Sequence, residues 1–146
     1  MNNPAPITAL IIGSGPDAKY AAALPLARFD YVIVINNAWQ ATPLWTHLVY
    51  PYDFPADRMP PQIASHQTLI DEQAFVPAQN NFGGFIYAGG TMAYTTAYWC
   101  LDVLRPHHIA HLGCDMHYPQ TGATHFYGTG SPDPLRKDIS LTSLEE

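Results

Sequence analysis

The chain has 146 residues, 47% of them hydrophobic and only 12% charged, which is enough for one domain but leaves few charges for its surface. Some apolar surface should therefore lie against another subunit, and we expect a homo-oligomer. The net charge is −6 and the basic residues are scattered, which excludes a nucleic-acid partner because such partners need clustered positive charge.

The number and spacing of cysteines and the sequence of the N-terminus indicate the cellular compartment of the protein. Cys100 and Cys114 show neither CxxC spacing nor a disulfide-rich pattern. The opening stretch MNNPAPITALIIG lacks a basic region and a long apolar run, so it does not predict a signal peptide. No apolar run approaches the ~18 residues that a membrane span requires. We expect a cytoplasmic protein.

The first half of the chain alternates between predicted strands and turns. ITALII (7–12) is a short apolar run that stops at Gly13, which is typical of a buried strand. The alanine-rich segment AKYAAALPLA (18–27) predicts a short helix broken near Pro25. Residues 31–35 are β-branched or aromatic throughout, as in a central strand of a parallel sheet. THLVY (46–50) predicts a third, shorter strand.

In the second half, residues 52–81 are rich in Pro, Asp, Gln and Asn and predict a long loop, with a short helix indicated around Leu69 and Ile70. GGFIYAGGT (83–91) predicts a brief apolar piece, residues 91–104 predict a helix, and HIAHLG (108–113) predicts a last strand. Strands that alternate with helices indicate an α/β fold. We expect one Rossmann-like, three-layer domain over residues 1–146 with a mainly parallel sheet.

The last residues contain Thr142-x-x-Glu145, the spacing of a capping box that begins a helix. The chain ends one residue later. Either this match is accidental or the chain is cut where its next helix begins, and the sequence slightly favours a truncated C-terminus.

Polar or glycine residues follow the predicted strands and precede the predicted helix. They are the turn Gly13, Ser14, Gly15 and Pro16, then Asn36 and Asn37, Asp53, the pair Gly89 and Gly90 with Thr91, and Asp115. Because the carboxyl ends of parallel strands meet at one edge of the sheet, we expect a single ligand site there. The glycine turn before a helix favours a phosphate or another anion, although it is not GxGxxG and lacks a P-loop lysine. The two asparagines are also typical turn residues.

The order of four segments resembles two related bacterial and archaeal groups. The segments are IIGSGP, VIVINN, GGTMAYTTAYWCLDV and IAHLGCDMHYPQTGATHFYG. One group is the bacterial sialyltransferases that use CMP-activated sialic acid. The other is the MptE-like group, which includes a pyrophosphokinase acting on 6-hydroxymethyl-dihydropterin. The likeness spans nearly the whole chain and implies a transferase that binds a nucleotide or nucleotide-sugar.

The resemblance also implies roles for individual residues. Residues 13–16 would hold the phosphate or ribose, Asn36 would meet the nucleotide, Gly90 and Thr91 would line the base or phosphate, and Asp115 would bond the sugar. Three positions depart from the pattern: Asp17 replaces the serine of a GPS turn, His117 replaces a sialyltransferase tyrosine, and Thr129 stands where the general base belongs. Glycosyl transfer and pyrophosphoryl transfer both stay open.

The segment CDMHYPQTGATHFYG (114–128) carries the residues best suited to chemistry. His117 and His125 can act as acid or base near neutral pH, or they can tie down a long loop through hydrogen bonds. His111, Cys114 and Asp115 add zinc-ligand types, but no zinc-site spacing is present, and a carboxylate could instead hold Mg²⁺ on a substrate phosphate. The alternative to a transferase is a non-catalytic nucleotide- or anion-binding module, or an inactive fragment.

Overall fold

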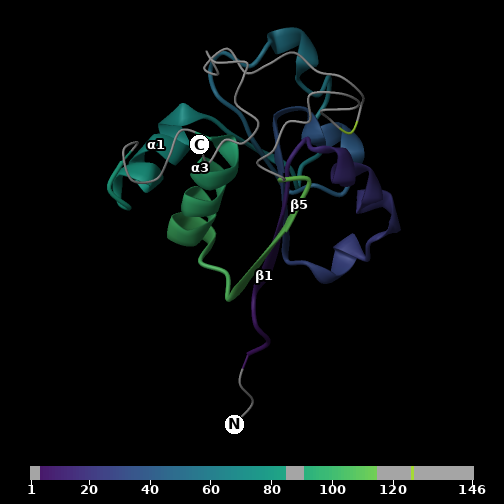
Figure 1. Cartoon of the computed structure of the whole chain (residues 1–146), viewed down its shortest axis with the longest axis horizontal. Coiled ribbons are helices and arrows are strands. Elements are labelled where there is room, and N and C mark those ends of the chain that lie inside the picture. Colours follow the sequence, from purple (N-terminus) through teal and green to yellow (C-terminus); the bar gives the residue numbers. More distant parts are fainter. Residues whose placement is uncertain (1–3, 85–90, 115–125, 127–146) are drawn as a thin grey trace.

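A computed structural model describes residues 4–84, 91–114 and 126 (Figure 1). Five parallel strands form one sheet in the order β4-β3-β2-β1-β5. Their bounds are β1 (Thr8–Ile12), β2 (Tyr31–Ile35), β3 (His47–Val49), β4 (Thr68–Ile70) and β5 (His108–Leu112). The expected α/β fold with a Rossmann-like parallel sheet is confirmed.

Alternate residues of β1 and β2 face opposite sides of the sheet, and both sides are covered. Ile11 and Ile33 contribute to one core with Trp99 and Cys100, whereas Ile12 belongs to a second core on the other side. This explains why these strands are apolar at nearly every position. Cys100 is fully buried, as its apolar surroundings predict, and burial raises the pKa of its thiol to about 11.

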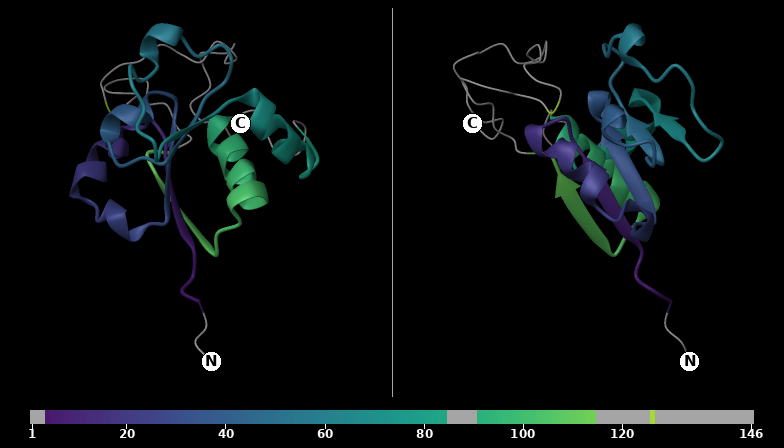
Figure 2. Two further views of the ribbon diagram at one scale, coloured as in Figure 1. Left: turned by 180° about the vertical axis from the view of Figure 1, so that it is seen from behind. Right: turned by 90° about the vertical axis from the view of Figure 1, so that its right-hand side faces the viewer.

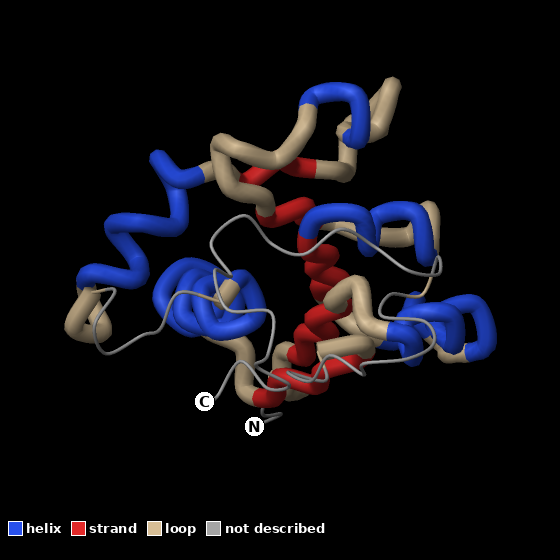
Figure 3. Tube along the Cα trace, turned by 45° about the horizontal axis from the view of Figure 1, so that its top comes forward, coloured by secondary structure: helices blue, strands red, loops and turns tan. Residues whose placement is uncertain are grey.

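Helices of two kinds cover the two faces, as Figures 2 and 3 show. One face carries α1 (Glu72–Asn80) and α3 (Met92–Trp99), the latter continued by a π-helical turn over Cys100–Leu104. The other face carries short 3₁₀ helices: η1 (Pro16–Ala23), η2 (Leu26–Arg28) and η3 (Asn36–Ala41). A further 3₁₀ turn, η4 (Ala56–Arg58), interrupts the loop between β3 and β4. The predicted alanine-rich helix is thus 3₁₀, and it ends at Ala23 just before Pro25.

The helix indicated around Leu69 and Ile70 is wrong at those residues, which belong to β4. Ile70 is buried in the same core as Phe75, so sheet pairing with β3 outweighs the weak helical pattern. The helix begins after Asp71, whose carboxylate accepts a hydrogen bond from the backbone N–H of Gln73 at 3.0 Å. The predicted apolar piece at residues 85–88 lies outside the described residues.

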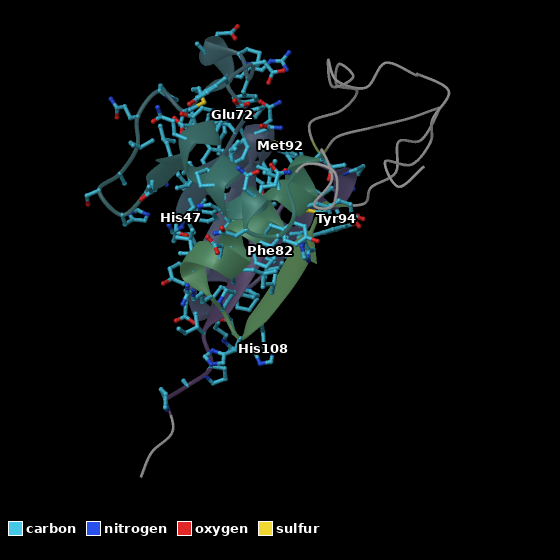
Figure 4. The ribbon with its side chains drawn as sticks, turned by 90° about the vertical axis from the view of Figure 1, so that its left-hand side faces the viewer. His47, Glu72, Phe82, Met92, Tyr94 and His108 are labelled. Atoms are coloured by element: carbon cyan, nitrogen blue, oxygen red, sulfur yellow. The ribbon has the colours of Figure 1, made fainter. Side chains whose placement is uncertain are left out.

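The strand order creates a switch point between β1 and β5. From β1 the chain adds β2, β3 and β4 in one direction, and then α1 and α3 return it to the other side of β1, where β5 pairs. Ligands of open parallel sheets bind beyond the carboxyl ends of the strands at such a point. Since α3 runs against the strands, Met92 lies near this edge and His108 lies at the opposite edge (Figure 4).

None of the helices among the described residues combines the length and the apolar character needed to cross a bilayer.

Candidate functional site

Two glycines bring the carboxyl ends of β1 and β5 into direct backbone contact. A Cβ atom on Gly13 would lie 2.6 Å from the carbonyl oxygen of Gly113, and one on Gly113 would lie 2.7 Å from the carbonyl oxygen of Gly13. Gly113 also has a φ of 70°, in the left-handed region that favours glycine. No side chain fits between these two strand ends.

Hydrogen bonds extend the contact between β1 and β5 into the glycine turn. The N–H of Gly13 donates to the carbonyl of Leu112 at 2.8 Å, and the N–H of Gly15 donates to the carbonyl of Gly113 at 2.8 Å. Neither group is then free for a ligand. The N–H and hydroxyl of Ser14 make no hydrogen bond among the described residues. An anion at this turn would therefore meet Ser14 and the first turn of η1, which begins at Pro16.

The segment with both candidate catalytic histidines lies outside the described residues, but its flanking residues, Cys114 and Phe126, are described. A Cβ atom on Gly13 would lie 2.9 Å from Sγ of Cys114. The N–H of Phe126 donates to the carbonyl oxygen of Ser14 at 3.0 Å, and the Phe126 ring packs against the core beneath η1. Both ends of the segment therefore contact the glycine turn.

Asn36 stands at the end of β2 beside this turn. Because Ile12 pairs with Val34, Ser14 and Asn36 occupy corresponding positions two residues past that pair. Asn36 has a φ of 51°, and its Oδ1 atom is buried without a hydrogen-bond partner among the described residues. An unpaired buried acceptor costs about 1–3 kcal/mol, so an N–H or O–H group of a ligand at this position would be stabilised. Asn37, 8% exposed, begins the buried side of η3.

The N-terminus of α3 reaches the same edge of the sheet. Thr91 caps the helix through its hydroxyl, which accepts a hydrogen bond from the N–H of Tyr94 at 3.3 Å. Met92, Ala93 and Cys114 all pack against the core on the α3 side of the sheet. The α3 N-terminus, with its partial positive charge, thus lies over the same core as Cys114, two residues past the end of β5.

The structure therefore brings seven of the predicted site residues to one edge of the sheet: Gly13, Ser14, Gly15, Pro16, Asn36, Asn37 and Thr91. Four others, Gly90, Asp115, His117 and His125, lie outside the described residues. Asp53 is exposed in the loop after β3, four residues past Val49. His111 lies on β5, where partial burial lowers its pKa.

Sequence reasoning missed the contributions of Gly113, Tyr50 and Asp71 to this edge. Tyr50 directly follows β3, and burial, then the charge of Asp71 and the neighbouring Tyr52, raise its pKa. Asp71 was missed because β4 was not recognised, although Thr68–Ile70 is a short β-prone run bounded by polar residues. The signal for Gly113 was a glycine directly after a predicted strand, the same signal that identified Gly13.

Most of the candidate zinc ligands lie outside the described residues. Within residues 4–84, 91–114 and 126, no three His, Cys, Asp or Glu side chains are grouped so that they could hold a metal ion. Of the five candidate zinc ligands, only His111 and Cys114 are among the described residues.

Comparisons with known proteins found no matching protein-family model, no matching curated protein and no matching solved structure.

Proposed function

We propose that the chain binds a nucleotide or nucleotide-activated donor at the carboxyl ends of β1 and β5, and transfers a group from it. The observation that carries this proposal is that two parts of the chain, the end of β5 and the histidine-bearing segment, meet at the glycine turn. Both ends of the histidine-bearing segment contact this turn, at the switch point of the sheet. The resemblance to sialyltransferases and to the MptE-like group supports the same interpretation.

Each described group at this edge has a distinct role in the proposal. Ser14 and the first turn of η1 hold a donor phosphate. The buried Oδ1 of Asn36 accepts a hydrogen bond from a ligand hydroxyl or amino group. Thr91 fixes the start of α3, whose dipole favours negative charge on the ligand. In the same proposal Gly90 lines the bound nucleotide, and the carboxylate of Asp115 accepts a hydrogen bond from a sugar hydroxyl.

The chemistry is assigned to the histidine segment. His125 or His117 activates the acceptor hydroxyl or protonates the leaving group, which needs a side chain that titrates near neutral pH. If the reaction is pyrophosphoryl transfer, Asp115 or Asp53 would hold a Mg²⁺ ion, which would supply charge neutralisation for the substrate phosphates. We place the enzyme in the cytoplasm as a homo-oligomer.

A thermal-shift panel tests ligand binding directly. CMP, CDP, UDP, GDP, AMP, ATP and NAD⁺ are each added with and without Mg²⁺. A ligand at about 100 times its Kd stabilises the folded state by about 2.7 kcal/mol, a clear rise in Tm for a domain of this size. A CMP shift without metal indicates glycosyl transfer, and an ATP shift that needs Mg²⁺ indicates pyrophosphoryl transfer. Absence of any shift would overturn the nucleotide site.

Variants then separate binding from catalysis. Asn36→Ala should remove the ligand-induced shift, whereas His125→Ala should keep the shift and abolish transfer or hydrolysis. Thr96→Val is the control, because Thr96 is fully buried in α3 and its hydroxyl also lacks a partner among the described residues. Binding without turnover in the unmodified chain would support the alternative, a non-catalytic binding module, which Thr129 at the expected base position favours.

A further inference from the structure

A cavity lies on the 3₁₀-helix side of the molecule, and none of its described lining residues belongs to the glycine turn. Its volume is about 540 Å³, within the range of small-molecule sites. Two stretches of chain line it: one runs from Trp39 in η3 to Trp45, and the other is the loop of residues 60–67 that leads to β4. Trp45 is 2% exposed and forms the floor, whereas Trp39 is only partly buried.

Hydrogen bonds join the two walls of the cavity. The indole N–H of Trp39 donates to the carbonyl of Arg58 at 2.9 Å, and the side-chain amide of Gln67 donates to the carbonyl of Pro43 at 3.2 Å. The Gln67 carbonyl oxygen in turn accepts the N–H of Ala64 at 2.8 Å. The loop is therefore held against η3, and the cavity is formed before any ligand binds.

The chemistry of the lining is uncharged. Its side chains are two indoles, three carboxamides, one imidazole, one hydroxyl and small apolar groups, from Trp39, Gln40, Thr42, Pro43, Trp45, Pro60, Gln62, Ile63, Ala64, His66 and Gln67. Among the described residues that line the cavity, no carboxylate, ammonium or guanidinium group is present, so these residues offer no counter-charge to a phosphate or carboxylate ligand. The side chains of Gln40, Gln62 and His66 make no hydrogen bond among the described residues.

We infer that this cavity binds the ring of a neutral saccharide. An indole face packs against the C–H face of a sugar ring, and carboxamides can donate to and accept from its hydroxyl groups at the same time. The open side-chain amides of Gln40 and Gln62 come from the two opposite walls, which suits hydroxyls spread around a ring edge. Trp39 supplies the stacking surface.

This site is separate from the proposed nucleotide site. Trp45 directly precedes Thr46 and β3, and Gln67 directly precedes β4, so this part of the cavity adjoins the amino ends of these strands, whereas Trp39 and Gln40 lie in η3, which follows β2. The glycine turn lies at the carboxyl ends. None of the lining residues that the structure describes belongs to the proposed nucleotide site. The inference therefore does not depend on the proposed function.

Saturation-transfer NMR and tryptophan fluorescence on the full chain test the inference. The probes are methyl β-galactoside, methyl β-glucoside and N-acetylglucosamine, with uridine as an uncharged aromatic comparator, each up to about 50 mM, well above a weak Kd of ~1 mM. At least one sugar should bind, and Gln40→Ala and Gln62→Ala should each weaken it about 5-fold, the effect of one lost hydrogen bond. Gln73→Ala is the matched control, because Gln73 is an exposed glutamine on α1.

Three outcomes would overturn the inference. They are no sugar binding over this range, sugar binding that Gln40→Ala and Gln62→Ala leave unchanged, and tighter binding of uridine than of every sugar. Both glutamines are exposed and form no hydrogen bond among the described residues, so their alanine variants should keep the Tm of the parent protein. A failure of folding therefore does not confuse the test.

Discussion

The ends of β5 and β2 lie on either side of the end of β1, and they are built in opposite ways. Between β1 and β5 the backbones touch, and a Cβ atom added to Gly13 or to Gly113 would collide with the carbonyl oxygen of the other glycine. At the end of β2, Asn36 buries an acceptor atom that nothing among the described residues satisfies. The contact between Gly13 and Gly113, here called the filled junction, is complete in the unliganded protein. At the end of β2, the Oδ1 atom of Asn36 has no hydrogen-bond partner among the described residues.

This difference separates structural roles from ligand-binding roles at one edge of the sheet. The filled junction positions the glycine turn and has no room for a larger side chain, so substitutions of its two glycines should lower stability the most. An unsatisfied acceptor lowers the stability of the unliganded protein and gains a partner only when a ligand binds. Substitutions at the two places should therefore change stability in opposite directions.

Gly113→Ala should have the largest effect. The added methyl group collides with the Gly13 carbonyl and the residue must keep a φ of 70°, so we expect a loss of roughly 3–5 kcal/mol in the free energy of unfolding, measured with urea. Gly13→Ala carries the collision without a left-handed φ and should lose about 2–3 kcal/mol. Gly84→Ala is the control, since Gly84 has a φ of 74° but a Cβ atom there would lie 3.4 Å from the nearest atom of the described residues, and this variant should lose about 1 kcal/mol.

If Gly113→Ala and Gly84→Ala lost the same free energy of unfolding, the left-handed backbone conformation alone would account for the effect. The proposed collision between β1 and β5 would then be contradicted.

Asn36→Gly should act in the opposite direction. It removes a left-handed asparagine and an unpaired buried oxygen, so we expect the unliganded protein to gain about 1 kcal/mol in urea unfolding. The same variant should lose the nucleotide-induced rise in Tm. If Asn36→Gly destabilises the unliganded protein instead, the asparagine has a structural role and its unpaired atom says nothing about a ligand.

How far the sequence predicted these features depends on how local their causes are. The strands around Ile11 and Ile33 are apolar on both faces, and their own composition predicts them. β4 was missed because its three residues become a strand only through pairing with β3 and burial of Ile70. The glycine turn was predicted from its position, but the use of its N–H groups by β5 depends on a register between strands about 100 residues apart. Local sequence carries no such information.

Thr96→Val tests whether an unpaired buried oxygen destabilises the protein wherever it lies. The Thr96 hydroxyl is buried in α3 without a partner among the described residues, so valine should raise the free energy of unfolding by up to about 1 kcal/mol and leave ligand binding unchanged. Its neighbour provides the control, because the hydroxyl of Thr95 accepts a hydrogen bond from the side-chain amide of Gln79 at 3.4 Å. Thr95→Val removes this acceptor and should therefore lower the free energy of unfolding. Equal changes in the free energy of unfolding for the two variants would contradict the prediction.

The smallest expected effect concerns pH and His47, on the α3 side of the sheet. Its ring lies 5.7 Å from that of Tyr31 and 5.4 Å from that of Trp99, measured between centroids, and burial lowers its pKa below the usual 6.5. The unfolded chain then binds a proton more readily than the folded protein. Stability due to this group is therefore complete above pH 6.5 and falls as the pH decreases toward the lowered value.

Urea unfolding at several pH values should show this decline, and His47→Phe, which keeps the aromatic packing but cannot be protonated, should reduce it. His111→Gln is the comparison, because the pKa of His111 is also lowered by burial but its side chain is more exposed. The prediction fails if His47→Phe does not change how steeply the free energy of unfolding falls below pH 6.5, while His111→Gln removes this fall. The decline would then arise from His111 on the outer strand β5.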